Sequence, residues 1–245
     1  MPINVDLSKK IEVQLSKLSI TEFEHKCQVQ LVLDTSGSTG EDYQNGAYDQ
    51  ALNILAHTAF ILDDNGKLET YVFSDDCKQL EDITQDNYLN YIKKKVQREV
   101  GGGTYYHNFI KLITEEDGLE NQKSESFVSK ALSFFKSSNE LKNKDLNQNE
   151  MPKLVFILTD GQDSNQEKTF EYFNKCKNYN IFWSFIGIGK QIKEFEFIEK
   201  LSKKFDNIGF TNIANLKKLS ENEIIEALLN SNLSNWLNKD LAIKK

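Results

Sequence analysis

Residues 28–38, with the sequence Gln-Val-Gln-Leu-Val-Leu-Asp-Thr-Ser-Gly-Ser, are the most informative segment for the fold class. The first six residues form a nearly continuous apolar run, which is typical of a strand in a parallel sheet that is covered on both faces. A polar loop follows at once, and a segment with helical spacing follows the loop. A strand, a loop and a helix in this order predict the first unit of an α/β domain.

The same pattern recurs along the chain. Further apolar runs lie at residues 68–73, 153–158 and 181–188, and a weaker run lies at 207–213. Segments with helical spacing separate these runs, and they cover residues 43–59, 88–100, 170–177, 195–204 and 223–229. Strands that alternate with helices predict right-handed crossovers. The sequence therefore predicts a doubly wound, mostly parallel sheet flanked by helices.

The beginning of the chain differs from this pattern. Ile11, Val13 and Leu15 alternate with polar neighbours, as the residues of a half-buried strand do. This alternation predicts an extra N-terminal strand, so we expect residues 1–26 to form a strand extension. The extension would pack on a single main domain of residues 27–240.

Two further segments add to the predicted sheet. Residues 77–83 follow a turn of Ser and Asp residues and predict an antiparallel edge strand. Residues 115–150 are polar and rich in Glu, Asn, Lys and Ser, which predicts an insertion in the main domain. Within this insertion, residues 127–135 have the spacing of one helix, and residues 139–150 have the composition of a loop.

Composition and charge exclude several classes of protein. Of the 245 residues, 39% are hydrophobic, yet no stretch reaches the roughly 18 unbroken apolar residues of a membrane span. The first residues lack the basic and apolar regions of a signal peptide, so we expect no secretion. The net charge of −7 argues against a nucleic-acid surface, which needs dense Lys and Arg.

The cysteines indicate a reducing compartment. Cys27, Cys77 and Cys176 are odd in number, lie far apart and form no Cys-x-x-Cys pair. With only three histidines in the chain, a structural zinc site is not expected. Scattered, reduced thiols are typical of a cytoplasmic protein.

The loop after the first strand carries the strongest chemical signal. Asp34, Ser36 and Ser38 place three oxygen ligands within one turn, and Gly37 allows the backbone to bend between them. In a doubly wound sheet, ligands bind at the carboxyl ends of the strands. Hard oxygen ligands suit Mg²⁺, Ca²⁺ or Mn²⁺ and are poor ligands for zinc or copper.

Two distant segments extend this signal. Three glycines precede Thr104, so a flexible loop presents another hydroxyl, and Asp160 follows the strand predicted at 153–158. A set of helix caps and turns is the simpler alternative for each segment alone. Together, the order Asp-x-Ser-x-Ser, then Thr, then Asp is similar to the metal-ion-dependent adhesion site of von Willebrand factor A (vWA) domains.

More specifically, the chain resembles the vWA domain of the tellurium-resistance TerF family. The similarity runs over nearly the whole chain apart from the polar insertion, and it rests on residues 31–38, 43–46, 62–68, 71–74, 155–161, 181–189, 195–198 and 206–210 and on the closing helix with Trp236 and Leu237. The chain departs from the family pattern at Thr39, where Met is common, and in the Tyr-Tyr-His-Asn sequence after Thr104. The expected metal ligands are all present.

The resemblance implies a role for each ligand. Ser36, Ser38 and Thr104 would touch the metal directly or through water. Asp34 and Asp160 would supply negative charge, at least one of them through bridging waters. The cation would then keep an exchangeable position, which a carboxylate from a partner protein completes. The resemblance thus implies a non-enzymatic, metal-dependent protein-interaction module, with Mg²⁺ or else Ca²⁺ or Mn²⁺, in bacterial stress response, including tellurium or phage resistance.

Two other functions remain open at this point. Asp34 beside Mg²⁺-type ligands is superficially similar to the nucleophile of Mg²⁺-dependent phosphohydrolases, although Ser36 stands where those enzymes need a second Asp. The second alternative is a regulatory vWA subunit that works with an ATPase or a kinase. The sequence contains neither a phosphate-binding P-loop nor a Gly-x-Ser-x-Gly motif, which favours the interaction module.

The rim of the expected site has aromatic and acidic residues of open role. Tyr43, Tyr105 and Tyr106 are either contact residues for a partner or packing residues. Glu41, Asp42 and Asp163 are either solvated, or able to repel an acidic partner or to hold an extra cation. We expect His107 to be a surface or packing histidine rather than a metal ligand. Trp183 and Trp236 are expected to pack. The sequence leaves the partner and the oligomeric state undetermined.

Overall fold

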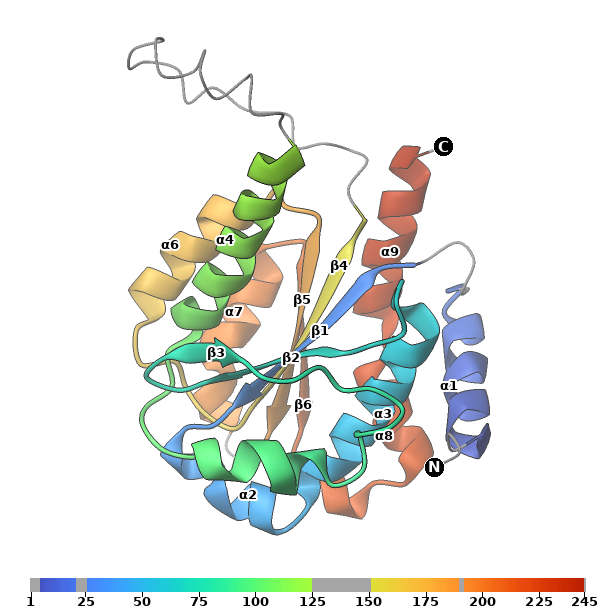
Figure 1. Cartoon of the computed structure of the whole chain (residues 1–245). Helices are drawn as coiled ribbons and strands as arrows, with labels where there is room; N and C mark the ends of the chain where they lie inside the picture. The colour runs from blue at the N-terminus through green and yellow to red at the C-terminus, as the bar shows by residue number, and fades with distance from the viewer. Residues whose placement is uncertain (1–4, 21–25, 125–150, 190–191, 245) are drawn as a thin grey trace.

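A central six-stranded sheet organises the structure, a computed structural model that describes residues 5–20, 26–124, 151–189 and 192–244 (Figure 1). The strand order is β3-β2-β1-β4-β5-β6. The strands are β1 (Gln28–Asp34), β2 (Glu69–Phe73), β3 (Cys77–Gln79), β4 (Lys153–Thr159), β5 (Ile181–Ile188) and β6 (Ile208–Ile213). All neighbours pair in parallel except β2 and β3. The prediction of a doubly wound, mostly parallel sheet with one antiparallel edge strand is confirmed.

Helices cover both faces of this sheet. The α-helices are α1 (Val5–Lys17), α2 (Gly40–Gln44), α3 (Ala47–Leu62), α4 (Tyr106–Ser124), α6 (Gln166–Cys176), α7 (Glu196–Lys204), α8 (Glu221–Leu228) and α9 (Ser231–Lys244). Figure 1 shows α4, α6 and α7 on one face and α1, α3, α8 and α9 on the other. Short 3-10 turns cover Gly37–Thr39, Gln97–Glu99, Ile192–Phe195 and Leu216–Lys218.

The apolar runs of the central strands supply both cores. On β1, Leu31 and Leu33 point into the core under α3, whereas Val32 points into the core under α4 and α6. Adjacent side chains of a strand point to opposite faces, so a strand between two helical layers must be apolar throughout. Trp183 is fully buried, and Trp236 of α9 stacks on Phe182 with ring centroids 5.4 Å apart. Both tryptophans therefore have the expected packing roles.

The predicted N-terminal strand is wrong, because this segment is the helix α1. Ile11 and Leu15 are buried, but Val13 between them is 56% exposed, which a common strand face would not allow. Leu7 completes an apolar stripe with helical spacing, and α1 packs on α3 and α8. Three alternating residues were too short a pattern to distinguish the two periods.

Residues with positive φ interrupt two of the predicted helices. Asn90, at φ 60°, lies within the segment predicted as one helix at 88–100, which instead contains a π-helical turn at Ile92–Val96 and a 3-10 turn. Gly46, at φ 78°, divides the helix predicted at 43–59 into α2 and α3. A left-handed residue cannot continue a right-handed helix, so the apolar spacing survives where the regular helix does not.

Two other predicted segments differ from the structure in their bounds. The strand predicted at 77–83 has only the three residues of β3, and Ile83 forms a separate antiparallel bridge with Leu68. Helix α4 extends into the predicted insertion as far as Ser124, while the helix and loop predicted at 127–135 and 139–150 lie outside the described residues. Within the described parts, no helix has the length and apolar character needed to cross a membrane.

Candidate metal centre

Four of the five expected ligands lie at or soon after the carboxyl ends of β1 and β4. Figure 1 shows the end of β1 close to α2. Strands β1 and β4 are neighbours, and their register pairs Leu33 with Leu158, so the residues that follow each strand are adjacent. The chain leaves β1 for β2 on one side and later returns to β4 on the other. This is the switch point at which doubly wound sheets bind ligands.

Asp34 is a buried acceptor held by donors from the protein. Its Oδ1 accepts a hydrogen bond from the Ser36 backbone N–H at 2.8 Å, and its Oδ2 accepts one from Thr159 Oγ1 at 2.5 Å. Burial raises the pKa of Asp34, and the hydrogen bonds from Ser36 and Thr159 oppose this effect. Tyr43 fixes the same residue by donating to its backbone carbonyl at 2.6 Å. Donors from the protein thus enclose Asp34 on its side chain and on its backbone carbonyl.

The three expected hydroxyl ligands and Asp160 share one small space. Ser36 Oγ lies 3.1 Å from Ser38 Oγ, which donates to Asp160 Oδ1 at 2.9 Å. Ser38 Oγ and Thr104 Oγ1 lie 4.0 and 3.9 Å from the position that a Cβ on Gly161 would occupy. Loops from three distant parts of the chain therefore bring their side-chain oxygens together.

The electrostatics of this space favour a cation. Burial, followed by the nearby Asp34 carboxylate, raises the pKa of Asp160 to about 7. A divalent ion between these groups would offset both effects, because it replaces lost hydration and separates the two negative charges. Hydroxyl and carboxylate oxygens are also the ligands that Mg²⁺, Ca²⁺ and Mn²⁺ prefer. The residues present fit such an ion.

A search based on acidic, histidine and cysteine side chains would miss this centre. The described residues contain no cluster of three or more His, Cys, Asp or Glu side chains suited to a metal. The reason is composition, since three of the five expected ligands are hydroxyls. The order of the motif along the chain was therefore the more informative signal.

Backbone hydrogen bonds hold the glycine-rich loop, residues 101–104, against the loop of residues 34–38 that follows β1, which we call the first metal loop. Gly101 N donates to Thr35 O at 2.8 Å, and Gly37 N donates to Gly102 O at 3.0 Å. Gly102 has φ 83°, which an L-residue with a side chain rarely adopts. Gly102 thus allows a turn in which the two backbones approach closely, and this turn brings Thr104 toward the loop that carries Ser38.

A second set of hydrogen bonds joins the glycine-rich loop to the loop after β4. Ser164 N donates to Thr104 O at 2.7 Å, and Tyr106 N donates to Asp163 Oδ1 at 3.1 Å. The Tyr106 hydroxyl donates to Gly161 O at 2.6 Å. These bonds fix Thr104 and Asp160 relative to each other.

The structure resolves most of the open roles at the rim. Tyr43 and Tyr106 are 1% and 0% exposed, so they pack and donate hydrogen bonds rather than present a contact surface. Asp163 is buried and braces Tyr106, and His107 is buried and stacks on Tyr172, as a packing histidine does. Tyr105 is partly exposed, so both of its roles stay open.

Sequence reasoning missed three residues that hold the expected ligands in place, namely Thr159, Ser164 and Asp75. Thr159 directly precedes Asp160 at the end of an apolar strand, which is a local signal. Ser164 and Asp75 reach the glycine-rich loop from segments 60 and 28 residues away. No local pattern reports such contacts.

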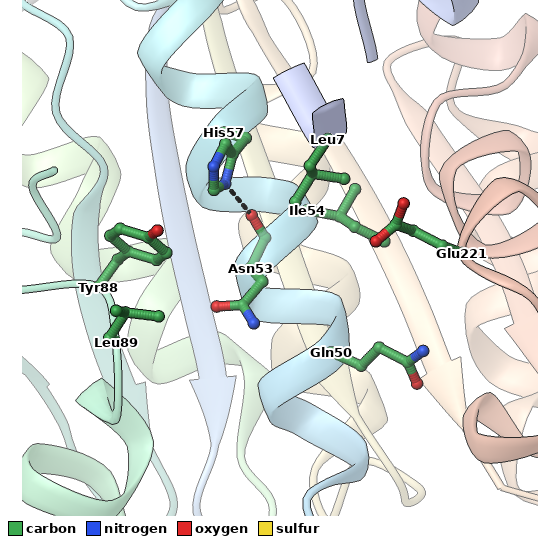
Figure 2. A pocket seen from close by; sticks show the side chains of 8 residues that line it. All are labelled: Leu7, Gln50, Asn53, Ile54, His57, Tyr88, Leu89 and Glu221. Carbon is green, nitrogen blue, oxygen red and sulfur yellow. Dashed lines mark hydrogen bonds between the residues drawn. The ribbon is translucent and has the colours of Figure 1, made fainter. Parts of the chain in front are cut away.

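A separate cavity of about 130 Å³ lies on the α3 face of the sheet. Figure 2 shows its lining from α1, α3, α8 and the segment after β3, which consists of Leu7, Gln50, Asn53, Ile54, His57, Tyr88, Leu89 and Glu221. His57 Nδ1 donates to the backbone carbonyl of Asn53 at 2.8 Å, and burial lowers the pKa of the ring. The imidazole is therefore neutral and oriented by its own helix.

The doubly wound sheet and the Asp-x-Ser-x-Ser loop at its switch point define a vWA domain. The chain belongs to the vWA-TerF-like family, described as the vWA domain found in the C terminus of TerF, and the match covers residues 26–243. It is 25% identical over 230 residues to the uncharacterized protein YcbR of Bacillus subtilis (strain 168). This alignment covers 92% of this chain and 83% of YcbR.

Solved structures show the same fold at low identity. Proximal thread matrix protein 1 from the mussel byssus aligns with a TM-score of 0.51 and 18% identity over 84% of this chain. The chain spans only about half of that protein, 48%. An aerotolerance-related membrane protein from Bacteroides fragilis NCTC 9343 aligns with a TM-score of 0.50 and 14% identity over 87% of this chain and 99% of that one.

Proposed function

We propose that this protein is a divalent-metal-dependent interaction module that binds a carboxylate of a partner protein. The metal would be held by Asp34, Ser36, Ser38, Thr104 and Asp160. The observation that carries the proposal is the convergence of the Ser36, Ser38, Thr104 and Asp160 oxygens from three loops, with the Asp34 carboxylate behind them.

Each side chain has a distinct part in this proposal. The Ser36, Ser38 and Thr104 hydroxyls would face the cation and contribute no net charge. Asp34 stays oriented by Ser36 N and Thr159, and Asp160 lies at the open side of the site, where it is partly exposed. When bound, the cation supplies a coordination position that can exchange water for a partner's oxygen.

The charge balance explains why the partner group would be a carboxylate. A cation whose nearest ligands are mostly neutral hydroxyls keeps much of its positive charge, so it attracts an anionic oxygen. We propose Mg²⁺ as the cellular ion, with Ca²⁺ or Mn²⁺ as alternatives. Membership of the TerF-type family supports a role in bacterial stress response, including tellurium or phage resistance, within the cytoplasm.

The geometry supports a binding role over catalysis. As a phosphohydrolase nucleophile, Asp34 would need an accessible oxygen, yet it is 0% exposed and both of its oxygens accept hydrogen bonds from the protein. The two histidines among the described residues are also poorly placed to act as a base at this site. His107 is buried and stacks on Tyr172, and His57 lines the cavity on the α3 face. We therefore propose that the protein is not an enzyme.

Calorimetric titration with Mg²⁺ tests the metal site directly. Ser38→Ala and Thr104→Ala each delete one proposed ligand oxygen, so both variants should bind Mg²⁺ much more weakly than the wild type. Thr114→Ala is a matched control, because Thr114 bonds only to backbone carbonyls of its own helix α4 among the described residues. Equal Mg²⁺ affinity in the wild type and both ligand variants would refute the site.

Capture of partners in Mg²⁺ and in EDTA tests the interaction. We expect proteins that are retained by the wild type in Mg²⁺ and lost both in EDTA and with Ser38→Ala. A partner that stays bound after chelation would instead support a fixed interface elsewhere, as in a regulatory subunit of an ATPase or kinase assembly.

A further inference from the structure

Asp75 lies beside the proposed metal centre but belongs to none of the three loops that carry the expected ligands. It follows β2, which is the neighbour of β1 in the sheet, and its side chain is exposed. We propose that Asp75 is a positioning residue of the metal centre, whose carboxylate holds the glycine-rich loop so that the Thr104 hydroxyl faces the cation. This inference rests on the proposed metal site and requires no particular partner.

The carboxylate of Asp75 lies directly against the loop. Its Oδ1 accepts a hydrogen bond from the Gly103 backbone N–H at 2.9 Å. Its Oδ2 lies only 2.5 Å from the place where a Cβ on Gly102 would be. No side chain fits between them, so the missing Cβ of Gly102 is what lets the carboxylate reach the amide of Gly103.

The backbone of Asp75 makes a second contact beyond Thr104. Its carbonyl accepts a hydrogen bond from Asn108 Nδ2 at 2.7 Å, in the first turn of α4. Asp75 therefore binds the chain on both sides of Thr104, at Gly103 before it and at Asn108 after it. A single residue thus spans the segment that presents the Thr104 hydroxyl.

The loop needs such a contact because its own conformation is weakly determined. Glycine has the widest choice of φ and ψ, and here three glycines in succession lead to the ligand. Bonds from the first metal loop hold Gly101 and Gly102, and Ser164 N holds the Thr104 carbonyl. The bond from Gly103 to Asp75 fixes the peptide between these two anchors.

Charge alone would give Asp75 a different role. A carboxylate near the site attracts a cation at long range, whether or not it holds the loop. Asp75→Asn separates the two roles, since its amide oxygen can still accept from Gly103 but carries no charge. Asp76→Ala is the matched control, because it deletes a neighbouring exposed carboxylate that makes no side-chain hydrogen bond or ion pair within the described part of the chain.

The test measures Mg²⁺ affinity by calorimetry in the wild type, Asp75→Ala, Asp75→Asn, Asp76→Ala, Thr104→Ala and the double variant Asp75→Ala/Thr104→Ala. Residues that orient metal ligands typically change affinity by about 10-fold or more, so we expect about a 10-fold loss in Asp75→Ala. Asp75→Asn and Asp76→Ala should stay within about 3-fold of the wild type. In the Thr104→Ala background, Asp75→Ala should cause no further loss, because the group that it positions is gone.

A metal-free measurement examines the same contact independently. Amide hydrogen exchange of Gly103 should be faster in Asp75→Ala and unchanged in Asp75→Asn. Unchanged exchange in Asp75→Ala, an equal loss of affinity in Asp75→Asn, or a full loss in the Thr104→Ala background would each overturn the positioning role. If the wild type binds Mg²⁺ and Asp75→Ala binds it equally well, only the role of Asp75 fails. A wild type that binds no Mg²⁺ refutes the metal site and, with it, the role of Asp75.

Discussion

The candidate metal centre and the cavity on the α3 face both contain buried polar side chains, but they organise them differently. At the metal centre, oxygens from three loops converge, and neighbouring residues hold each loop in place. In the cavity, His57 bonds within its own helix, and its Nε2 has no hydrogen-bond partner among the described residues (Figure 2). We infer that oxygen atoms converging from several loops indicate a binding site, whereas a cavity lined by isolated polar side chains does not.

This contrast predicts that substitutions in the two regions affect different quantities. Changes at the metal centre should alter Mg²⁺ affinity more than stability. Changes around the cavity should alter stability and leave Mg²⁺ affinity as it is. Four substitutions test this contrast.

Asp34→Asn should have the largest effect, on metal binding. The substitution keeps the shape, but its single amide oxygen can accept from only one of Ser36 N and Thr159, and it removes one negative charge beside the cation. Unit charges about 4 Å apart near a protein surface interact by about 4 kcal/mol, so Mg²⁺ affinity should fall by about 100-fold or more. Calorimetry measures the loss, and urea unfolding without metal checks that the fold is kept. An affinity within a few-fold of the wild type would contradict the assignment of Asp34.

Ile54→Ala should mainly change stability. Ile54 lines the cavity and is 1% exposed, so the substitution enlarges a space that its neighbours only partly close. Such truncations typically lower the free energy of unfolding by about 2–5 kcal/mol. Urea unfolding should show this loss, whereas the Mg²⁺ dissociation constant of the folded protein should stay the same. A 10-fold change in that constant would show that the two regions are coupled.

Gly102→Ala should affect both quantities to a smaller extent. A left-handed conformation typically costs about 1–2 kcal/mol for a residue with a side chain, and the new Cβ would also displace the Asp75 carboxylate. We therefore expect lower stability together with weaker Mg²⁺ binding. Gly66→Ala is the matched control, because Gly66 has φ 71° and no atom within 4 Å of its Cβ position. The control should lose stability alone. Equal Mg²⁺ affinities in the two variants would show that the clash with Asp75 is unimportant.

His57→Phe should have the smallest effect, on the pH dependence of stability. Burial lowers the pKa of His57 in the folded state below the usual 6.5, so the unfolded chain binds this proton more readily. The stability from neutral His57 is present above pH 6.5 and is lost as the pH falls through the lowered folded-state pKa. Thermal unfolding between pH 7.5 and about 5 should therefore show a smaller loss in His57→Phe than in the wild type. A parallel loss in both proteins would mean that His57 does not titrate in this range.

Individual residues show how far sequence reasoning reached. Asp34, Ser36 and Ser38 are neighbours in the chain, so their spacing already places them on one turn, and Asp160 follows an apolar strand whose end could be located. Val13 shows the opposite case. Its alternation with Ile11 and Leu15 fits a strand over three residues, and only the packing of α1 on α3 and α8 shows that it points into solvent.

The framework around the ligands needed the folded structure. Asp75 contacts Gly103 because β2 lies beside β1, and Thr159 reaches Asp34 because β4 lies on the other side of β1. Strand order and register create both contacts, and neither can be read from the spacing of residues within one segment.

The amino-acid sequence alone was sufficient to predict the α/β class, the extended apolar strands and the chemical type of the expected site, because these depend on local periodicity and on which side chains follow each strand. Only the folded structure showed that residues 5–17 form a helix, that donors enclose Asp34 and that Asp75 reaches the glycine-rich loop. Those outcomes depend on which segments, far apart in the sequence, pack against each other and exclude water, and this packing exists only in the folded chain.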